Sequence, residues 1–430
     1  MTSEKFKKRL FRIFPKSGFA RGVSILAGGT VISQLIAIFT LPLLTRLYSP
    51  EDFSILAVYS SLLALVTVVS CLRFEIAIPI PKENKKAKDL LALSLISVFF
   101  VNVVFSMLLI MFSNEIHSIT QGRLIGYLWI IPLGGVLTGA YAAYQYWATR
   151  EKNYNLISET KITQAVSGSS TQIGLGYLGL TPLGLLIGQV INMGGGVWRL
   201  AHHYYKNNPP LRKEIVRGEI KDTFREYEKY PKLSTLEALT NSAASQVPLL
   251  LIATYAAGPE VGFLMLSIRL LSAPMALLGR AVGQVYLSEA PYYHQNGKLN
   301  QYTRKTILVL TKLGFFPLLV AGVASPFLVP VIFGEEWSRA GVLIAWMVPW
   351  FFMQFISSPV SISLHMVAKH KAALILQCFG FLFRSGIVLY AGLYLNNLVV
   401  EIYAITGFLF YSIYMAVIFS VLKLSEVKCD

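Results

Sequence analysis

Charged residues are scarce in this sequence. They make up 14% of its 430 residues, whereas hydrophobic residues make up 54%. A soluble domain carries about 25% charged residues, because its surface must face water. Most of the surface of this protein therefore cannot face water, and we expect membrane spans rather than soluble globular domains.

Cysteine and histidine are also few, which argues against two kinds of structural site. Cys71, Cys378 and Cys429 are far apart and odd in number, so we expect no disulfide framework. The six histidines lack metal-ligand spacing. The adjacent pair, His202 and His203, would point about 100° apart on a helix. We expect no metal site.

Long apolar runs are abundant, and each of twelve is long enough to cross a bilayer as a helix of about 20 residues. They predict an all-α integral membrane protein. The spans are expected at about residues 22–45, 53–72, 90–112, 124–148, 162–180, 182–200, 233–256, 261–278, 307–332, 341–366, 372–394 and 398–422.

Lysine and arginine lie almost entirely on one side of these spans. Seven segments on that side hold 32 of the 38 basic residues, and the other side holds Arg46, Arg123 and Arg339. Because basic loops remain in the cytoplasm, we predict that both termini are cytoplasmic. The net charge of +16 follows from these loops, which lie next to anionic lipid. Its spread over seven short segments argues against a nucleic-acid partner.

The same pattern predicts how the chain is organised. Two bundles of six helices are joined by a cytoplasmic linker and flanked by short basic ends. The expected parts are a basic amphipathic N-terminus at 1–21 on the inner membrane surface, bundles at 22–200 and 233–422, a linker with a surface helix at 201–232, and a tail at 423–430.

An internal duplication supports the two bundles. Four short matches recur in the same order at offsets of 209 to 219 residues. They are Ser33-Gln34 with Ser245-Gln246, Pro50-Glu51 with Pro259-Glu260, Trp129-x-x-Pro132 with Trp346-x-x-Pro349, and ATREK (148–152) with VAKHK (367–371). Six spans per copy is an even number, so the copies run in the same direction and are related by an axis along the membrane normal.

Three basic residues lie inside the spans, where each costs about 2.5–3.5 kcal/mol at mid-membrane. Arg269 and Arg384 lie near the middle of the eighth and eleventh spans. Lys312 lies closer to the cytoplasmic end of the ninth, where it either extends to the membrane surface or serves as a further substrate-binding candidate. No acidic residue matches the two arginines in depth. They either line a polar cavity or pair within the bundle; in a cavity they would suit phosphate, which guanidinium binds through two parallel hydrogen bonds.

Several further polar residues are candidates for the same cavity. Gln34, Asn241 and Gln246 on the first and seventh spans either line it or hydrogen-bond between helices. Arg46, on the sparsely charged face, either anchors the first span or faces the cargo. Gly184-x-x-x-Gly188 predicts close helix packing rather than a nucleotide-binding turn.

The amino-acid sequence resembles that of a known family. GGTVISQLIAIFTLPLLTRLYSPEDFSILAVYSSLLALV, RFEIAIPIPK and YPKLSTLEALTNSAASQVPLLLIATYAAGPEVGFLMLSIRLLSAPMALLGRAVGQV are similar to the polysaccharide biosynthesis (Wzx-type) flippases, as are GEEWSRAGVLI and ISSPVS. The resemblance covers nearly the whole chain. It implies two six-helix bundles around a central cavity that opens alternately to each side, in a superfamily that includes multidrug exporters and the lipid II flippase.

The resemblance also implies a function. The cargo would be an undecaprenyl-diphosphate-linked oligosaccharide for O-antigen, capsule or exopolysaccharide, moved across a bacterial cytoplasmic membrane. Arg269, and with less support Arg384, would meet the diphosphate. The polysaccharide polymerase and chain-length machinery would be partners, and a Na⁺ or H⁺ gradient would drive transport without a bound cofactor. Few carboxylates lie within the spans, so the coupling ion stays open.

Three alternatives remain at this point. A drug or metabolite exporter shares the superfamily, but its cargo is often cationic, which mid-membrane arginines disfavour. A membrane glycosyltransferase, polymerase or ligase would need a large catalytic loop, and the sequence has neither a long external loop nor a convincing catalytic constellation. A scaffold of the export assembly is the third. We therefore expect a transporter and not an enzyme.

Overall fold

The computed structural model describes residues 18–120, 122, 124–208, 217–256, 258–361, 363–366 and 370–426. Within these ranges all regular secondary structure is helical, as predicted. Most of the predicted amphipathic N-terminus, the middle of the linker (209–216) and the end of the tail (427–430) lie outside the described residues.

Each of the twelve predicted spans corresponds to a helix. The first half of the chain forms α2 (Gly18–Leu47), α3 (Pro50–Ser70), α4 (Asn84–Met111), α5 (Ser113–Thr120), α6 (Ile130–Arg150), α7 (Tyr154–Tyr177), α8 (Leu183–Gly194), α9 (Val197–Asn207) and α10 (Arg217–Glu226). The second half forms α11 (Thr235–Tyr255), α12 (Glu260–Gln295), α13 (Leu299–Phe333), α14 (Ser338–Ser357), α15 (Ser363–Met366), α16 (His370–Tyr394) and α17 (Val399–Glu426). Short 3-10 or π turns join several of them.

Two predicted spans are interrupted. The span expected at 182–200 ends with α8 at Gly194 and resumes as α9 at Val197, so two glycines, Gly195 and Gly196, separate the two helices. The span expected at 341–366 ends with α14 at Ser357, because Pro359 has no backbone N–H to donate to the Phe355 carbonyl and so cannot continue the helix. A run of apolar residues does not reveal such breaks.

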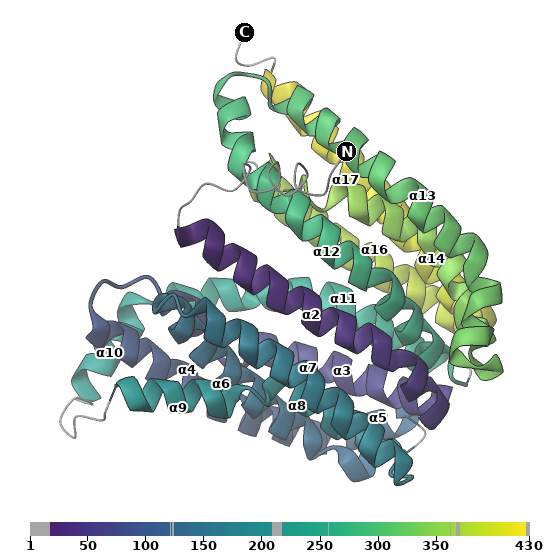
Figure 1. Ribbon diagram of the computed structural model, residues 1–430, viewed down its shortest axis with the longest axis horizontal. Coiled ribbons are helices and arrows are strands. Elements are labelled where there is room, and N and C mark those ends of the chain that lie inside the picture. Colours follow the sequence, from purple (N-terminus) through teal and green to yellow (C-terminus); the bar gives the residue numbers. More distant parts are fainter. Residues whose placement is uncertain are drawn as a thin grey trace, which may run out of the picture.

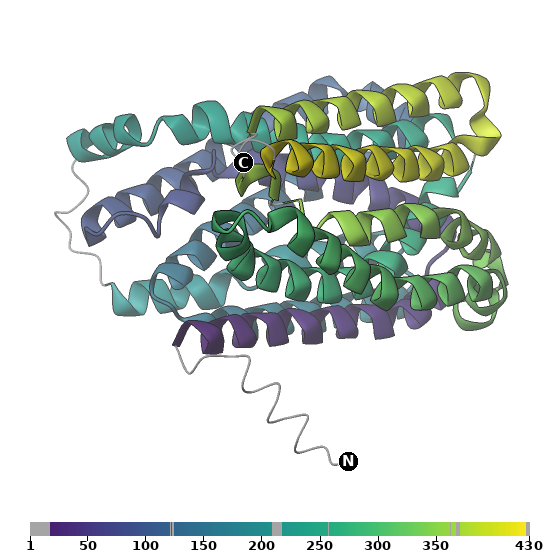
Figure 2. The ribbon, with the colours of Figure 1, turned by 90° about the horizontal axis from the view of Figure 1, so that it is seen from above.

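The long helices form two lobes (Figure 1). In the first lobe, α2 packs on α7, α7 on α8, and α6 on α4 and α8; in the second, α11 packs on α16, α13 on α14, and α14 on α17. The lobes meet where α3 packs against α11 and α12. Figure 2 shows the long helices of both lobes running roughly side by side.

Two ends of the molecule are distinguished below. The basic end holds the turns at 71–83, 151–153 and 296–298, whose neighbourhood is rich in lysine and arginine, and the junction end holds the turns at 48–49, 258–259 and 334–337. Toward the basic end the α12–α13 pair diverges from the first lobe (Figure 1).

Local signals at the junction end explain where two helices begin. Ser49 caps α3: its hydroxyl accepts a hydrogen bond from the Asp52 amide at 3.2 Å, and the Asp52 carboxylate accepts one from the Ser49 amide at 3.0 Å. Such a capping box satisfies donors that a helix start leaves free. The duplicated Pro-Glu also marks a helix start in the second lobe, where α12 begins at Glu260 directly after Pro259, whereas α3 begins at Pro50 itself.

The duplicated Trp-x-x-Pro does not keep its position. Trp129 precedes α6 and Pro132 lies in its first turn, whereas Trp346 and Pro349 lie well inside α14. The two Trp-x-x-Pro motifs therefore lie on corresponding helices, since α6 and α14 are the fourth long helices of their lobes. They do not lie at corresponding positions along those helices, and in this respect the interpretation of the motif as a repeated feature is wrong. Pro can occupy a first turn without loss of a hydrogen bond, but inside a helix it removes one.

Among the described residues, eight helices are long and apolar enough to cross a membrane. They are Ser24–Leu47, Pro50–Ser70, Asn84–Met111, Ile125–Arg150, Leu299–Phe333, Glu335–Ser357, Ile375–Tyr394 and Asn396–Lys423. The other four predicted spans correspond to α7, α8, α11 and α12, of which α8 has only 12 residues and the rest carry several polar side chains. Three of these helices, α7, α8 and α12, supply most of the polar lining of the larger cavity described next.

Candidate functional site

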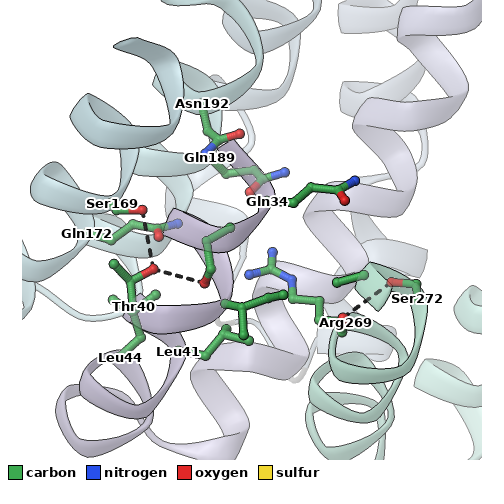
Figure 3. Close-up of a pocket in the computed structure, with 13 residues that line it drawn as sticks. Gln34, Thr40, Leu41, Leu44, Ser169, Gln172, Gln189, Asn192, Arg269 and Ser272 are labelled. Carbon is green, nitrogen blue, oxygen red and sulfur yellow. Dashed lines mark hydrogen bonds between the residues drawn. The ribbon is translucent and has the colours of Figure 1, made fainter. Parts of the chain in front are cut away.

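A cavity of about 430 Å³ lies between the two lobes. Helices α2, α7 and α8 of the first lobe form one side, and α12 of the second lobe forms the other (Figure 3). Eight of the thirteen residues that line it are polar: Gln34, Thr40, Ser169, Gln172, Gln189, Asn192, Arg269 and Ser272. At about 30 Å³ per water molecule, the volume corresponds to about fourteen waters.

Close packing of α7 against α8 forms the first-lobe wall. A methyl group on Gly188 would lie 2.8 Å from the carbonyl oxygen of Gly168 and would also strike the Gln172 side chain, and one on Gly184 would strike the Tyr48 hydroxyl. The prediction that Gly184-x-x-x-Gly188 serves helix packing is thus confirmed. Such small residues let the backbones approach closely.

Hydrogen bonds then fix the polar groups on this wall. The Tyr48 hydroxyl donates to the Gln172 carbonyl at 2.6 Å, and the Gln172 amide donates to the Leu185 carbonyl at 3.3 Å. The Thr40 and Ser169 hydroxyls lie 3.4 Å apart, which links α2 to α7 (Figure 3). The wall is therefore a rigid polar surface rather than a set of loose side chains.

Arg269 is the one charged residue among the thirteen described residues that line the cavity. Its side chain extends from α12 toward α2 (Figure 3), and the Ser272 hydroxyl contacts its backbone carbonyl at 3.4 Å. In the described part of the chain, its guanidinium has neither a hydrogen-bond partner nor a carboxylate within ion-pair distance. Positive charge in the cavity is thus not neutralised by the protein around it.

Gln34 lies in the same cavity as Arg269, on the opposite lobe. Its Oε1 atom is buried, and no described residue donates a hydrogen bond to it. Buried polar atoms in native proteins usually have a partner, so an orphaned acceptor beside a cavity marks a place where a ligand or water can bind.

Arg384 lies elsewhere, in a pocket of about 180 Å³ within the second lobe. Helices α11, α16 and α17 form this pocket, together with Ser358 and Ser361 after α14, and the predicted candidate Asn241 lies on its α11 side. The guanidinium carbon lies 4.5 Å from the ring centre of Trp350 and 4.6 Å from that of Tyr403. The two mid-membrane arginines therefore occupy different sites.

The remaining predicted candidates line neither cavity. Arg46 is exposed in the last turn of α2 at the junction end. Lys312 is exposed on α13, among exposed apolar residues such as Leu308 and Phe316. Gln246 is half-buried on α11. The structure thus brings together Gln34 with Arg269, and Asn241 with Arg384, but not all seven candidates.

The junction between the lobes holds functional candidates that sequence reasoning missed. Trp337 is fully buried and donates its indole N–H to the Thr45 carbonyl at 3.1 Å. Its ring meets those of Phe53 and Phe263, with centroids 4.8 and 5.9 Å away. The Gly262 amide donates to the Ser54 hydroxyl at 2.8 Å. The lobes are joined at the end opposite the basic loops.

An ion-pair network braces the second lobe at this junction. Arg339 Nε lies 3.0 Å from the Glu260 carboxylate, and its Nη2 lies 2.6 Å from the Glu401 carboxylate. These contacts tie the starts of α12, α14 and α17 to one another. No group of three or more histidine, cysteine or acidic side chains suited to a metal ion occurs among the described residues.

Comparison with known proteins places this fold. Among solved structures, one described as the lipid II flippase MurJ in an inward closed conformation matches with a TM-score of 0.69 and 14% identity, over 94% of this chain and 90% of that chain. An inward-facing multidrug resistance MATE family transporter of the MOP superfamily matches with a TM-score of 0.58 and 15% identity, over 94% of each chain. The likeness confirms the predicted two-lobed architecture of twelve spans.

The sequence itself matches a family model. No curated protein is similar enough to this chain to match it. The model described as polysaccharide biosynthesis protein, however, matches residues 43–342, which is well over half of the chain. Together with the fold, this match identifies the chain as a member of the polysaccharide biosynthesis protein family.

Proposed function

We propose that this protein is a flippase for undecaprenyl-diphosphate-linked oligosaccharides, and that Arg269 binds the diphosphate. The observation that carries the proposal is the lone, unneutralised guanidinium of Arg269 in a polar cavity between the lobes. Guanidinium binds phosphate oxygens through paired, charge-assisted hydrogen bonds. The family to which the chain belongs is described as acting in polysaccharide biosynthesis, which supports a glycan cargo.

The other groups in the cavity suit the sugars of this cargo. Amide and hydroxyl side chains, including Gln34, Gln189 and Asn192, can exchange hydrogen bonds with sugar hydroxyls. The polyprenyl tail would stay in the bilayer, because nothing in a polar cavity compensates for removing it from lipid. A relative by fold, MurJ, is described as a flippase of a lipid, lipid II, which supports a lipid-linked cargo.

We further propose that the basic end faces the cytoplasm of a bacterial cell, with both termini on that side. In this orientation the lobes are closed at the external end by Trp337, and the cargo would enter from the cytoplasmic leaflet. Separation of the lobes at the junction, with closure at the basic end, would then present the head group outside. No chemical step is required, so the protein would act as a transporter and not an enzyme.

The test is replacement of Arg269 in cells that depend on this protein for a surface glycan. Arg269→Ala should lower external glycan output and cause lipid-linked glycan to accumulate on the cytoplasmic leaflet, at normal levels of inserted protein. Arg269→Lys keeps the charge but loses paired hydrogen bonds, so an intermediate result is expected. Arg199→Gln, on an exposed arginine of α9, is the matched control. Unchanged output in Arg269→Ala at normal protein levels would falsify the proposal.

Direct binding separates this cargo from that of a drug exporter, the other activity described for this fold. Purified wild-type protein should bind undecaprenyl diphosphate at least about tenfold more tightly than undecaprenol, because charge-assisted hydrogen bonds contribute about 1.5–3 kcal/mol. Arg269→Ala should remove most of this preference. Preference for a cationic dye over the diphosphate would support the exporter instead.

A further inference from the structure

We propose that the Arg384 pocket is a second, separate anion site that binds one carboxylate-sized anion. The pocket lies inside the second lobe and shares no lining residue with the Arg269 cavity. Its volume of about 180 Å³ corresponds to roughly six water molecules. A single small anion with a few waters, or one acidic group of a larger molecule, fits this space, whereas a whole diphosphate-linked glycan does not.

The unpartnered donors of Arg384 carry the inference. The residue is only 7% exposed, yet its Nε and Nη2 atoms are buried without a hydrogen-bond partner in the described part of the chain. A guanidinium has five N–H donors and cannot lose its charge by deprotonation in a protein. Burial of such donors without acceptors is costly, so an acceptor from outside the protein is expected at this place.

The aromatic contacts of Arg384 do not supply that acceptor. Trp350 and Tyr403 lie against the guanidinium through their rings, with centroids 4.5 and 4.6 Å from its central carbon. A cation–π contact compensates charge over the ring face, but the N–H groups in the guanidinium plane remain without acceptors. The two rings therefore hold the orientation of Arg384 and leave its Nε and Nη2 donors without an acceptor.

The rest of the pocket suits an anion held by neutral donors. No aspartate or glutamate is among the described residues that line it, so nothing there competes for the positive charge. Asn241 and Ser245 on α11 are exposed and form an outer rim, while Gln377 and Tyr411 supply further polar groups. A buried cation beneath an open, neutral, polar rim is the arrangement expected of an anion site.

Two sources can present such an anion. One is an acidic sugar of the cargo, whose carboxylate would enter the pocket, and the other is a free inorganic anion such as chloride. The experiment uses the purified full-length protein in detergent, with thermal unfolding followed during titration at constant ionic strength. Sodium glucuronate tests the first source, sodium chloride the second, and glucose is the neutral control. A ligand that binds only the folded protein raises the unfolding midpoint in a saturable way.

Four variants make the test specific. Arg384→Gln should abolish the shift, and Arg384→Lys should weaken binding by about tenfold, since lysine lacks the planar fork of donors. Ser245→Leu leaves the arginine in place and narrows the pocket from its rim, so it carries the test should Arg384→Gln fail to fold. Arg199→Gln is the exposed control and should retain the full shift.

The outcomes differ clearly. A saturable shift with glucuronate but not glucose, lost in Arg384→Gln or Ser245→Leu, supports the site and assigns it to acidic sugars. The same dependence with chloride supports the site and assigns it to a free anion. No saturable shift with either anion, or a shift that persists in both variants, overturns it. Because none of these measurements involves Arg269, failure here leaves the proposed diphosphate site untouched, and the reverse also holds.

Discussion

Replacement of Trp337 by phenylalanine should release the contact that joins the lobes. Trp337 belongs to the second lobe, and its indole N–H donates to the Thr45 carbonyl of the first lobe at 3.1 Å. Thr45 lies in the last turn of α2, where carbonyls lack intrahelical donors. In a continuing helix the Thr45 carbonyl would accept a hydrogen bond from the amide of Ser49, four residues later. That amide instead donates to the Asp52 carboxylate. Phenylalanine therefore leaves the Thr45 carbonyl buried and without a partner.

The size of the effect follows from this loss. A buried acceptor without a partner costs about 1–3 kcal/mol, and the smaller ring retains part of the edge-to-face contact with Phe53. A cost of about 2 kcal/mol, borne only by the state in which the junction is closed, changes the ratio of the two states by about 30-fold. The fraction of molecules that are open at the junction end should rise about 30-fold, as long as the open state remains less populated than the closed state.

Cysteine labelling can measure this population. Ser272→Cys places a thiol in the cavity between the lobes, in a protein whose native cysteines are replaced by serine. A membrane-impermeant maleimide added at the outer side should label this thiol about 30-fold faster in Trp337→Phe. Trp346→Phe, on a half-exposed tryptophan of α14, the helix that directly follows Trp337, is the matched control. Equal rates in parent and Trp337→Phe, or the same acceleration in the control, would refute the role of Trp337 in holding the lobes together.

Three further predictions concern stability, each measured as the midpoint of thermal unfolding in detergent. Arg339→Ala should destabilise by about 3–5 kcal/mol, because it leaves the buried Glu401 carboxylate without its ion pair; a change below about 1 kcal/mol would contradict this. Gly188→Ala should cost about 1–3 kcal/mol through overpacking against α7, whereas Gly174→Ala, with open space around it, should be neutral or stabilising. Ser49→Ala should cost about 0.5–2 kcal/mol through loss of the α3 cap, with Ser49→Thr retaining most of it.

The positions of the spans could be predicted because two independent signals coincide in this sequence. Twelve apolar runs predict the spans, and the alternation of basic and neutral loops agrees with that number of crossings. The helix ends were harder to predict. The chain continues helically past the apolar run in α12, from the predicted end at 278 to Gln295, because a polar extension outside the bilayer has no hydropathy signal.

The charged residue of the candidate site could be predicted from the sequence, but most of its neutral polar residues could not. Arg269 and Gln34 attract notice because polar groups within a span need a reason. Ser169, Gln172, Gln189 and Asn192 line the same cavity, yet in the sequence they resemble any polar residues of α7 and α8. Their placement depends on the approach of these two helices at their glycines, which is a property of tertiary packing. The role of Trp337 could likewise not be predicted, because its contacts with Phe53 of α3 and Phe263 of α12 exist only in the folded protein.

The two mid-membrane arginines show what sequence position cannot decide. Both lie deep in a span and neither has an acidic neighbour of matching depth, so one-dimensional reasoning assigns them the same roles. Rotation about the helix axis separates them: Arg269 on α12 faces the other lobe across an open cavity, and Arg384 on α16 faces aromatic rings of its own lobe. A charge at the lobe interface changes its surroundings whenever the lobes move apart, whereas a charge inside one lobe keeps them. Under the two proposals above, Arg269 would therefore respond to cargo during transport, and Arg384 would hold its anion through the whole cycle.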